Sequence, residues 1–388
     1  MTDPLQIMIV AGEASGDLHG AKLVTALRDE ITPSQAEFFG CAGPRMREAG
    51  VEAIVQADSL AIVGLPEIAK ALPVFLKAFG ALKRSALGRR PDVVILVDFP
   101  EFNLKLARSL KRIGCRVVYY ISPQLWAWRK YRIGTIRNDV DLLITILPFE
   151  KAWYAEQGLD HVEFVGSPLA KEVHAETSKA AFLEEFESDP SRPIVALLPG
   201  SRRKEIDKIF PIMLAAAARI SKDQPEIQFI AALGSPATRS QAAQLIDRLK
   251  TTGNAPSDLI IIEGRTYDAL NASDAAAVTS GTATLEAGIL GTPMAIVYKT
   301  SRLNYKLMRP LISVPHFGLI NLIAEKRIAK ELIQDEFTPE TLADEILRIL
   351  APEENAKMRG ELRTAAEKLG RGGASKRAAQ AILGLLGR

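Results

Sequence analysis

Short apolar runs, mostly of β-branched residues, alternate along this chain with longer stretches of helical character. Ile7 to Val10 is the first such run, and Leu18 to Arg28 has the spacing of a helix. Near-continuous apolar runs are typical of parallel strands that are covered on both faces. The alternation therefore predicts a doubly wound α/β fold. The other strands predicted in this part of the chain are Glu37–Gly40, Val93–Val97, Arg116–Ile121, Leu142–Leu147 and Val162–Val165.

A second series of the same kind follows a polar segment, Ala175 to Pro193. Its predicted strands are Ile194–Leu198, Gln228–Ala232, Leu259–Ile262, Ala275–Thr279 and Met294–Tyr298. At ~150 residues per domain, a chain of 388 residues suits two such domains. We expect Rossmann-like domains at 1–170 and 171–350, with a ligand cleft between them at the carboxyl ends of the strands. A helical tail at 351–388 could pack across the domains or between subunits.

Charge and cysteine content exclude several classes of protein. The chain has 49 basic and 46 acidic residues, a net charge of +3, which is too balanced for a protein that coats nucleic acid. Cys41 and Cys115 form no disulfide framework, and no Cys/His spacing indicates zinc, so we expect a reduced, cytoplasmic setting. The longest uncharged run, Pro310 to Ala324, falls short of the roughly 20 residues that a spanning helix needs. We expect neither such a helix nor a signal peptide, and peripheral membrane contact stays open.

The loop after the first strand, Gly12 to Gly20, is rich in glycine and in polar side chains. Its spacing fits neither a dinucleotide fingerprint nor a P-loop. Its carboxylates and histidine would repel an anion, so the loop is expected to recognise hydroxyl groups. The alternative is a tight strand-to-helix turn in which Asp17 caps the helix that follows.

Asp98 directly follows the predicted strand Val93–Val97. Burial beside Phe99 and Phe102 would raise its pKa toward the range of a general base. Asp98 is therefore the candidate base. The alternative is a helix cap, a role that Glu101 and Asn103 downstream could share.

Two tryptophans, Trp126 and Trp128, stand near the end of another predicted strand and beside Arg129. Such side chains can stack on a sugar or line an acyl pocket. Packing in the core explains either tryptophan equally well.

Two strand-to-helix turns in the second domain suit a nucleotide diphosphate. Gly200 and Ser201 can offer backbone amides and Arg202 a bidentate guanidinium, while the helix adds its positive end. The turn Thr279 to Glu286 brings small hydroxyl residues, and its glutamate could accept from ribose hydroxyls. The alternatives are a solvated basic turn and an ordinary capped helix.

The segment Ile68 to Arg90 has an apolar helical face flanked by cations. This is the profile of a helix lying on an anionic bilayer, although a crossover helix packed on its sheet has the same periodicity. The predicted membrane contacts are Ile68, Leu72, Phe75, Phe79, Lys77, Lys83 and Arg84.

Together these motifs resemble the lipid-A-disaccharide synthase family, glycosyltransferases of Gram-negative outer-membrane lipid synthesis. The resemblance spans nearly the whole chain in order. The segments that carry it are Gly12–Asp17, Gly43–Met46, Asp98–Asn103, Ser122–Arg129, Leu147–Glu150, Leu198–Arg202, Ser280–Glu286 and Lys330–Gln334.

The resemblance implies a GT-B-type fold and an inverting reaction. UDP-2,3-diacylglucosamine and 2,3-diacylglucosamine 1-phosphate (lipid X) would give a tetraacyl disaccharide 1-phosphate and UDP. It implies no metal and no cofactor, no nucleic acid, contact with the cytoplasmic face of the inner membrane, and a possible homodimer.

The resemblance also assigns roles to residues. Asp98 is the implied base or acceptor-orienting acid. The implied acceptor and sugar set is Glu13, Ser15, Asp17, His19, Glu101, Asn103 and Trp128. The implied UDP set is Gly200, Ser201, Arg202, Ser280, Gly281, Thr282, Glu286 and Asn321. Two other functions remain open: a UDP-N-acetylglucosamine epimerase of the same fold, and a non-catalytic nucleotide-sugar-binding protein.

Overall fold

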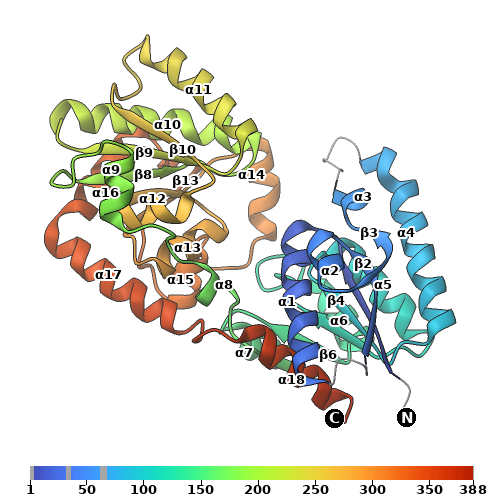
Figure 1. Ribbon diagram of the computed structural model, residues 1–388. Coiled ribbons are helices and arrows are strands. Elements are labelled where there is room, and N and C mark those ends of the chain that lie inside the picture. The colour runs from blue at the N-terminus through green and yellow to red at the C-terminus, as the bar shows by residue number, and fades with distance from the viewer. Residues whose placement is uncertain (1–3, 32–35, 62–67, 388) are drawn as a thin grey trace. The chain divides into compact units, whose positions relative to one another are not determined.

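The computed structural model describes residues 4–31, 36–61 and 68–387, and the chain divides into two compact units (Figure 1). The first unit comprises Met1–Pro168 and Arg371–Arg388, and the second comprises Leu169–Gly370. None of the helices within the described ranges is long and apolar enough to cross a membrane.

The first unit contains a seven-stranded parallel sheet in the order β3-β2-β1-β4-β5-β6-β7. Its strands are β1 Leu5–Ala11, β2 Ala36–Ala42, β3 Glu52–Gln56, β4 Val93–Val97, β5 Val117–Tyr120, β6 Leu142–Thr145 and β7 Val162–Phe164. The strand order reverses between β1 and β4, so the loops that follow these two strands meet at the topological switch point. Ligands of open α/β sheets bind at such a point.

Side chains of successive strand residues enter two separate apolar clusters. Met8 and Val10 lie in one cluster, and Ile7 and Ile9 lie in the other. This explains why the strands are apolar without alternation, and the prediction of a doubly wound sheet is confirmed. The helices of this unit are α1 Ala14–Glu30, α2 Pro44–Glu48, α3 Asp58–Ala61, α4 Ile68–Arg89, α5 Pro100–Lys111, η3 Lys130–Arg132, α6 Ile133–Asp139, α7 Glu150–Glu156 and α18 Ala374–Leu385.

The second unit contains a six-stranded parallel sheet in the order β10-β9-β8-β11-β12-β13, with its switch point between β8 and β11. Its strands are β8 Ile194–Leu198, β9 Gln228–Leu233, β10 Leu259–Glu263, β11 Ala275–Thr279, β12 Met294–Tyr298 and β13 Glu331–Ile333. Its helices are α8 Leu169–Glu172, α9 Lys179–Glu185, α10 Arg203–Asp223, α11 Pro236–Lys250, α12 Thr266–Ala272, α13 Thr282–Ile289, α14 Arg302–Met308, η4 Arg309–Leu311, α15 Leu319–Ala324, η5 Gln334–Glu336, α16 Pro339–Leu350 and α17 Pro352–Glu367.

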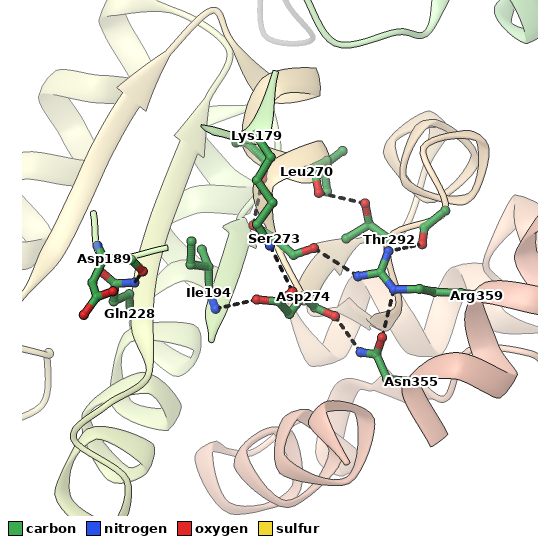
Figure 2. A network of polar contacts seen from close by, with 12 residues as sticks. Lys179, Asp189, Ile194, Gln228, Leu270, Ser273, Asp274, Thr292, Asn355 and Arg359 are labelled. Atoms are coloured by element: carbon green, nitrogen blue, oxygen red, sulfur yellow. Dashed lines mark hydrogen bonds and ion pairs between the residues drawn. The ribbon is translucent and has the colours of Figure 1, made fainter. Parts of the chain in front are cut away.

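A polar network fixes α17 to the amino edge of the second sheet (Figure 2). The Asp274 carboxylate accepts from the backbone N–H of Ile194 at 3.0 Å and from Lys179 Nζ at 3.1 Å. Asn355 of α17 donates to the Asp274 carbonyl at 2.8 Å, and Arg359 donates to Asn355 Oδ1 at 2.8 Å. This edge is opposite the carboxyl ends of the strands. The network therefore stabilises the fold and does not involve the switch point.

The last helix, α18, packs on α1 in the first unit. Ala378 and Ile382 are fully buried in the same apolar cluster as Leu23 and Leu27 of α1. Arg377 Nε also donates to the Val165 carbonyl at 2.8 Å. The tail expected at 351–388 is therefore divided, since α17 belongs to the second unit and α18 to the first.

Candidate functional site

Asp98 lies at the switch point of the first sheet. Ala11 of β1 and Val97 of β4 are paired, so Gly12 and Asp98 leave neighbouring strands side by side. Asp98 and Phe99 both have left-handed backbone angles, with φ of 46° and 52°. Two consecutive non-glycine residues in this region are uncommon and cost of the order of 1–3 kcal/mol each. Such strain is concentrated at functional sites, which supports a functional role for this turn.

The electrostatics of Asp98 suit a proton acceptor near neutral pH. Burial, the main cause, raises the pKa of the Asp98 carboxyl to about 6, and the negative charge of Glu13 raises it further, while a hydrogen bond from the Phe99 backbone opposes both. A carboxylate in this range is largely ionised at pH 7 and is still basic enough to accept a proton from a hydroxyl group.

The backbone of Asp98 is held by two buried side chains. Tyr119, which is fully buried, donates its hydroxyl to the Asp98 carbonyl at 2.7 Å. Asn103 Nδ2 donates to the same carbonyl at 2.8 Å and to the Val97 carbonyl at 3.2 Å. The prediction that Asn103 contacts a sugar is therefore wrong, because its amide is buried and holds the strand end. Tyr119 was missed because an apolar strand gives no sign of which hydroxyl turns inward.

Asp17 is also a structural residue and does not line the sugar side. Its buried carboxylate accepts from the backbone N–H groups of Gly43 at 2.8 Å, Arg45 at 2.9 Å and Met46 at 3.1 Å. These amides begin α2, and a carboxylate at a helix amino end is favourable. A Cβ on Gly43 would lie 2.5 Å from the Asp17 carboxyl carbon, so glycine is needed there. The alternative had Asp17 capping the helix that follows its own loop, but Asp17 lies inside that helix, α1, and caps α2 instead.

The other predicted residues of this loop remain accessible. Glu13 and Ser15 are exposed at the amino end of α1, and His19 is partly buried one turn further on. Glu13 forms no side-chain cap with its helix. These side chains share the carboxyl edge of the sheet with Asp98.

Two arginines surround Glu101, which lies on α5 close in sequence to the Asp98 turn. Arg129 precedes η3, and Arg132 belongs to it. The Glu101 carboxylate forms ion pairs with Arg129 and with Arg132, the latter at 2.7 Å. These pairs, chiefly the hydrogen bond from Arg132, hold the pKa of Glu101 below its usual value. The Arg129 guanidinium stacks over the half-buried Trp128 ring, 4.2 Å from its centroid. Glu101 therefore positions two arginines, and Trp128 supports one of them.

The loop that carries these arginines rests on a buried carboxyl group. Glu150 is 1% exposed and accepts from Trp126 Nε1 at 3.0 Å and from the backbone N–H of Leu147 at 3.0 Å. Burial raises the pKa of Glu150 to about 7. Ser122 and Tyr154 form a neighbouring hydroxyl pair at 2.9 Å. Trp126 is thus a core residue, as the structural alternative held.

In the second unit, the loops after β8 and β11 also leave paired strands, since Leu198 and Val278 are partners. Gly200 has φ of 106°, and a Cβ there would lie 2.6 Å from Glu205 Oε2. Glu205 accepts from the backbone N–H of Arg202 at 3.3 Å and from Arg202 Nη1 at 3.2 Å. A carboxylate therefore already caps α10. The Arg202 guanidinium, 83% exposed, and the exposed Ser201 are the parts open to a ligand.

The turn Ser280–Thr282 opens α13. The Ser280 hydroxyl donates to the Phe317 carbonyl at 2.8 Å and keeps its lone pairs for another donor. Gly281, with φ of 146°, and Thr282 are exposed at the start of the helix. No side chain caps this start, so the first amides, which a helix leaves without intrahelical partners, can donate to an anion.

Glu286 lies one turn further along α13 and is partly buried. Tyr267 donates its hydroxyl to Glu286 Oε1 at 3.2 Å. Burial raises the pKa of Glu286. One carboxylate oxygen stays available for a hydroxyl donor. Tyr267 was missed, because it lies on α12 and no motif marks it.

Asn321 does not belong to this set. It is fully buried, and its Nδ2 donates to the Ala329 carbonyl at 2.8 Å and to Glu331 Oε1 at 2.9 Å. Its Oδ1 accepts from the backbone N–H groups of Ile328 at 2.9 Å and Ala329 at 3.0 Å. The amide is saturated. The prediction that it binds UDP is wrong, and it instead closes the loop between α15 and β13.

The face of α4 predicted to meet a membrane is partly turned into the unit. Phe75 and Phe79 pack against the apolar core, and both rings contact Phe102. Their prediction as membrane contacts is wrong, because the helix uses this stripe to cover the sheet. Leu72, Lys77 and Arg84 are exposed, Lys83 is half-exposed, and the side chain of Ile68 lies outside the described residues.

No group of three or more His, Cys, Asp or Glu side chains among the described residues is arranged to hold a metal ion.

Comparison with known proteins gives a consistent result. The family model described as lipid-A-disaccharide synthetase matches residues 7–384. The chain is 45% identical to the lipid-A-disaccharide synthase of Geobacter sulfurreducens, over 99% of this chain and 98% of that protein. It is 41% identical to that of Myxococcus xanthus, over 100% and 99% respectively.

Solved structures of low identity share the fold. The Staphylococcus aureus MnaA–UDP structure has a TM-score of 0.66 at 13% identity, over 99% of this chain and 97% of that one. The calicheamicin glycosyltransferase CalG4 has a TM-score of 0.59 at 15% identity, over 100% and 99%. The two parallel-sheet domains thus have the GT-B architecture.

Proposed function

The chain belongs to the lipid-A-disaccharide synthase family, glycosyltransferases of lipid A biosynthesis, and from this we propose its substrates and the roles of its residues. The donor is UDP-2,3-diacylglucosamine and the acceptor is 2,3-diacylglucosamine 1-phosphate. An acceptor hydroxyl attacks the anomeric carbon of the donor, the bond to the UDP oxygen breaks, and the configuration inverts.

The observation that carries the proposal is Asp98 at the switch point of the first sheet. An inverting transfer in one step needs one base for the attacking hydroxyl. Asp98 has a carboxyl pKa of about 6 and a backbone held by Tyr119 and Asn103. It accepts the proton of the acceptor hydroxyl as the new bond forms.

The second unit takes the nucleotide. The leaving diphosphate needs positive charge, which Arg202 and the free amides at the start of α13 supply. Thr282 offers its hydroxyl to the phosphates. Ser280, whose hydroxyl hydrogen goes to the Phe317 carbonyl, accepts from a hydroxyl of the donor, and Glu286 accepts from the ribose. Similarity in fold to the S. aureus MnaA–UDP structure supports a UDP site in a protein of this architecture. We propose that neither a metal nor a cofactor takes part, so activity should persist in excess EDTA.

The acylated substrates place the enzyme at the cytoplasmic surface of the inner membrane in this proposal. The exposed residues of α4, among them Leu72 and Lys77, are the first candidates for that contact. A homodimer remains a separate proposal, to be tested by sedimentation.

The decisive experiment is incubation of the purified protein with both lipid substrates, with disaccharide and UDP as the expected products. Asp98→Asn should lower kcat by roughly 10²-fold or more while UDP binding is kept. Arg202→Ala should instead weaken UDP binding, and Arg203→Ala, an exposed cation one residue further on, is its control.

Other results would contradict the proposal in different ways. Isomerised donor would indicate an epimerase, and tight binding without turnover would indicate a binding protein. Near-normal turnover by Asp98→Asn would remove Asp98 as the base.

A further inference from the structure

The second unit carries an exposed apolar stripe that none of the roles above uses. Leu303 and Leu307 of α14 are 68% and 63% exposed, and Leu311 of η4 is 56% exposed. Leu303 and Leu307 are one helical turn apart and therefore share a face. Leu311 follows at the same spacing. Large apolar side chains exposed together mark a site of interaction, whereas single ones need no explanation.

Cations flank these leucines along the same segment. Arg302, Lys306 and Arg309 are all exposed. Arg302 pairs with Asp335 at 3.7 Å, but both side chains are almost fully in solvent, so this ion pair contributes little. Apolar side chains alternating with exposed cations are typical of a segment that lies in the interface of an anionic bilayer.

The stripe is connected to the loop that we assign to the donor. The Arg309 guanidinium lies over the Phe317 ring, 5.8 Å from its centroid. The Phe317 carbonyl in turn accepts the hydroxyl hydrogen of Ser280 at 2.8 Å. A surface bound at α14 would therefore lie close to the position from which an acylated donor must enter.

We propose that α14 and η4 form a lipid-docking surface of the second unit, separate from α4. Leu303, Leu307 and Leu311 enter the headgroup layer of an anionic bilayer, and Arg302, Lys306 and Arg309 contact lipid phosphates. The inference rests on the proposed function, because the acylated substrates of that function reside in such a bilayer. Its test does not depend on turnover.

The test is sedimentation of the full chain with phosphatidylglycerol vesicles and with phosphatidylcholine vesicles. The chain should bind the anionic vesicles, and the triple variant Leu303→Ser, Leu307→Ser, Leu311→Ser should bind them at least tenfold more weakly. Tyr131→Ser, an exposed side chain of the first unit outside both α4 and α14, is the control for a single exposed apolar side chain. Lys306→Glu should weaken binding to anionic vesicles and leave binding to neutral ones unchanged.

Two measurements exclude other causes of weaker vesicle binding by the triple variant. Circular dichroism and UDP affinity should be unchanged in the triple variant, which shows an intact second unit. Sedimentation velocity should show the same oligomeric state as the parent chain. Vesicle binding equal to the parent would overturn the proposal, and so would a loss of binding that only accompanies a loss of self-association, since a second copy would then be the occupant. If the parent binds vesicles through this stripe yet forms no disaccharide, the proposed function fails and the docking surface stands.

Discussion

The ring of Phe99 fills the space that a side chain on residue 12 would need. A Cβ placed on Gly12 would lie 2.3 Å from Phe99 Cδ1, well inside van der Waals contact. The two residues belong to the loops that leave β1 and β4 at the switch point. The left-handed turn at Asp98 and Phe99 is thus matched to a glycine on the neighbouring strand.

Gly12→Ala should therefore destabilise the first unit by about 1–3 kcal/mol, because the ring must move from a packed position. Phe99→Ala in the same chain should relieve much of that extra cost, so the two changes should be strongly non-additive in a double-mutant cycle of unfolding free energies. Gly88→Ala, on a helix where an added Cβ meets nothing within 4 Å, should be neutral or slightly stabilising. Strict additivity would contradict the contact.

Glu13→Gln should shift the acidic limb of the kcat/KM profile to lower pH. The negative charge of Glu13 raises the pKa of Asp98, so removing it favours the ionised, active carboxylate. In the parent chain, activity should fall as the pH drops through about 6. Asp29→Asn, an exposed charge at the other end of α1, should leave the profile in place. A limb that stays fixed in Glu13→Gln would mean that another group controls it.

Glu150→Gln should be better tolerated at pH 8 than at pH 5. The folded-state pKa of Glu150 is raised to about 7, so the folded parent binds a proton more tightly than the unfolded chain and loses stability as the pH rises from about 4.5 to 7. The glutamine variant lacks this loss. The difference in unfolding free energy between parent and variant should therefore shrink by on the order of 2 kcal/mol between pH 5 and pH 8. Denaturant unfolding at both pH values measures it. Glu156→Gln, exposed on the same helix, should show no such trend.

Asn321→Ala should lower stability and leave UDP affinity unchanged in the folded protein. Four hydrogen bonds of a fully buried amide are lost, which should cost about 2–4 kcal/mol. Glu286→Gln should do the reverse, with a weaker UDP complex and a small change in melting temperature. Calorimetric titration with UDP and thermal unfolding distinguish the two. Weakened UDP binding at unchanged stability would restore Asn321 to the site.

The sequence predicted the fold well because buried parallel strands are apolar throughout. The strands it missed were β3 and β13, at the edges of their sheets. β3 begins at Glu52 and ends at Gln56, and none of its residues is fully buried, so its pattern is weak. β13 has only three residues, and its first, Glu331, is a buried carboxylate that a strand pattern does not suggest.

The site was predicted less completely than the fold, because a polar residue in a motif can either bind a ligand or hold backbone groups. Asp17 and Asn103 hold backbone groups, whereas Asp98 remains the candidate base. Burial and hydrogen-bond partners separate these cases, and the partners of Asp17 come from residues 43–46, far along the chain. The same limit applied to α4, because an apolar helical face looks alike whether it covers a sheet or meets lipid.

The packing of α18 on α1 has a consequence for biosynthesis. During translation the opening βα segments leave the ribosome early, yet the helix that covers Leu23 and Leu27 is made only after the second unit. The apolar surface of the first unit is therefore covered only after the whole second unit has been synthesised. A fragment that ends near residue 168 should be prone to aggregation. A rearranged gene that places residues 371–388 before residues 1–168 should yield the first unit as an independent protein that does not aggregate.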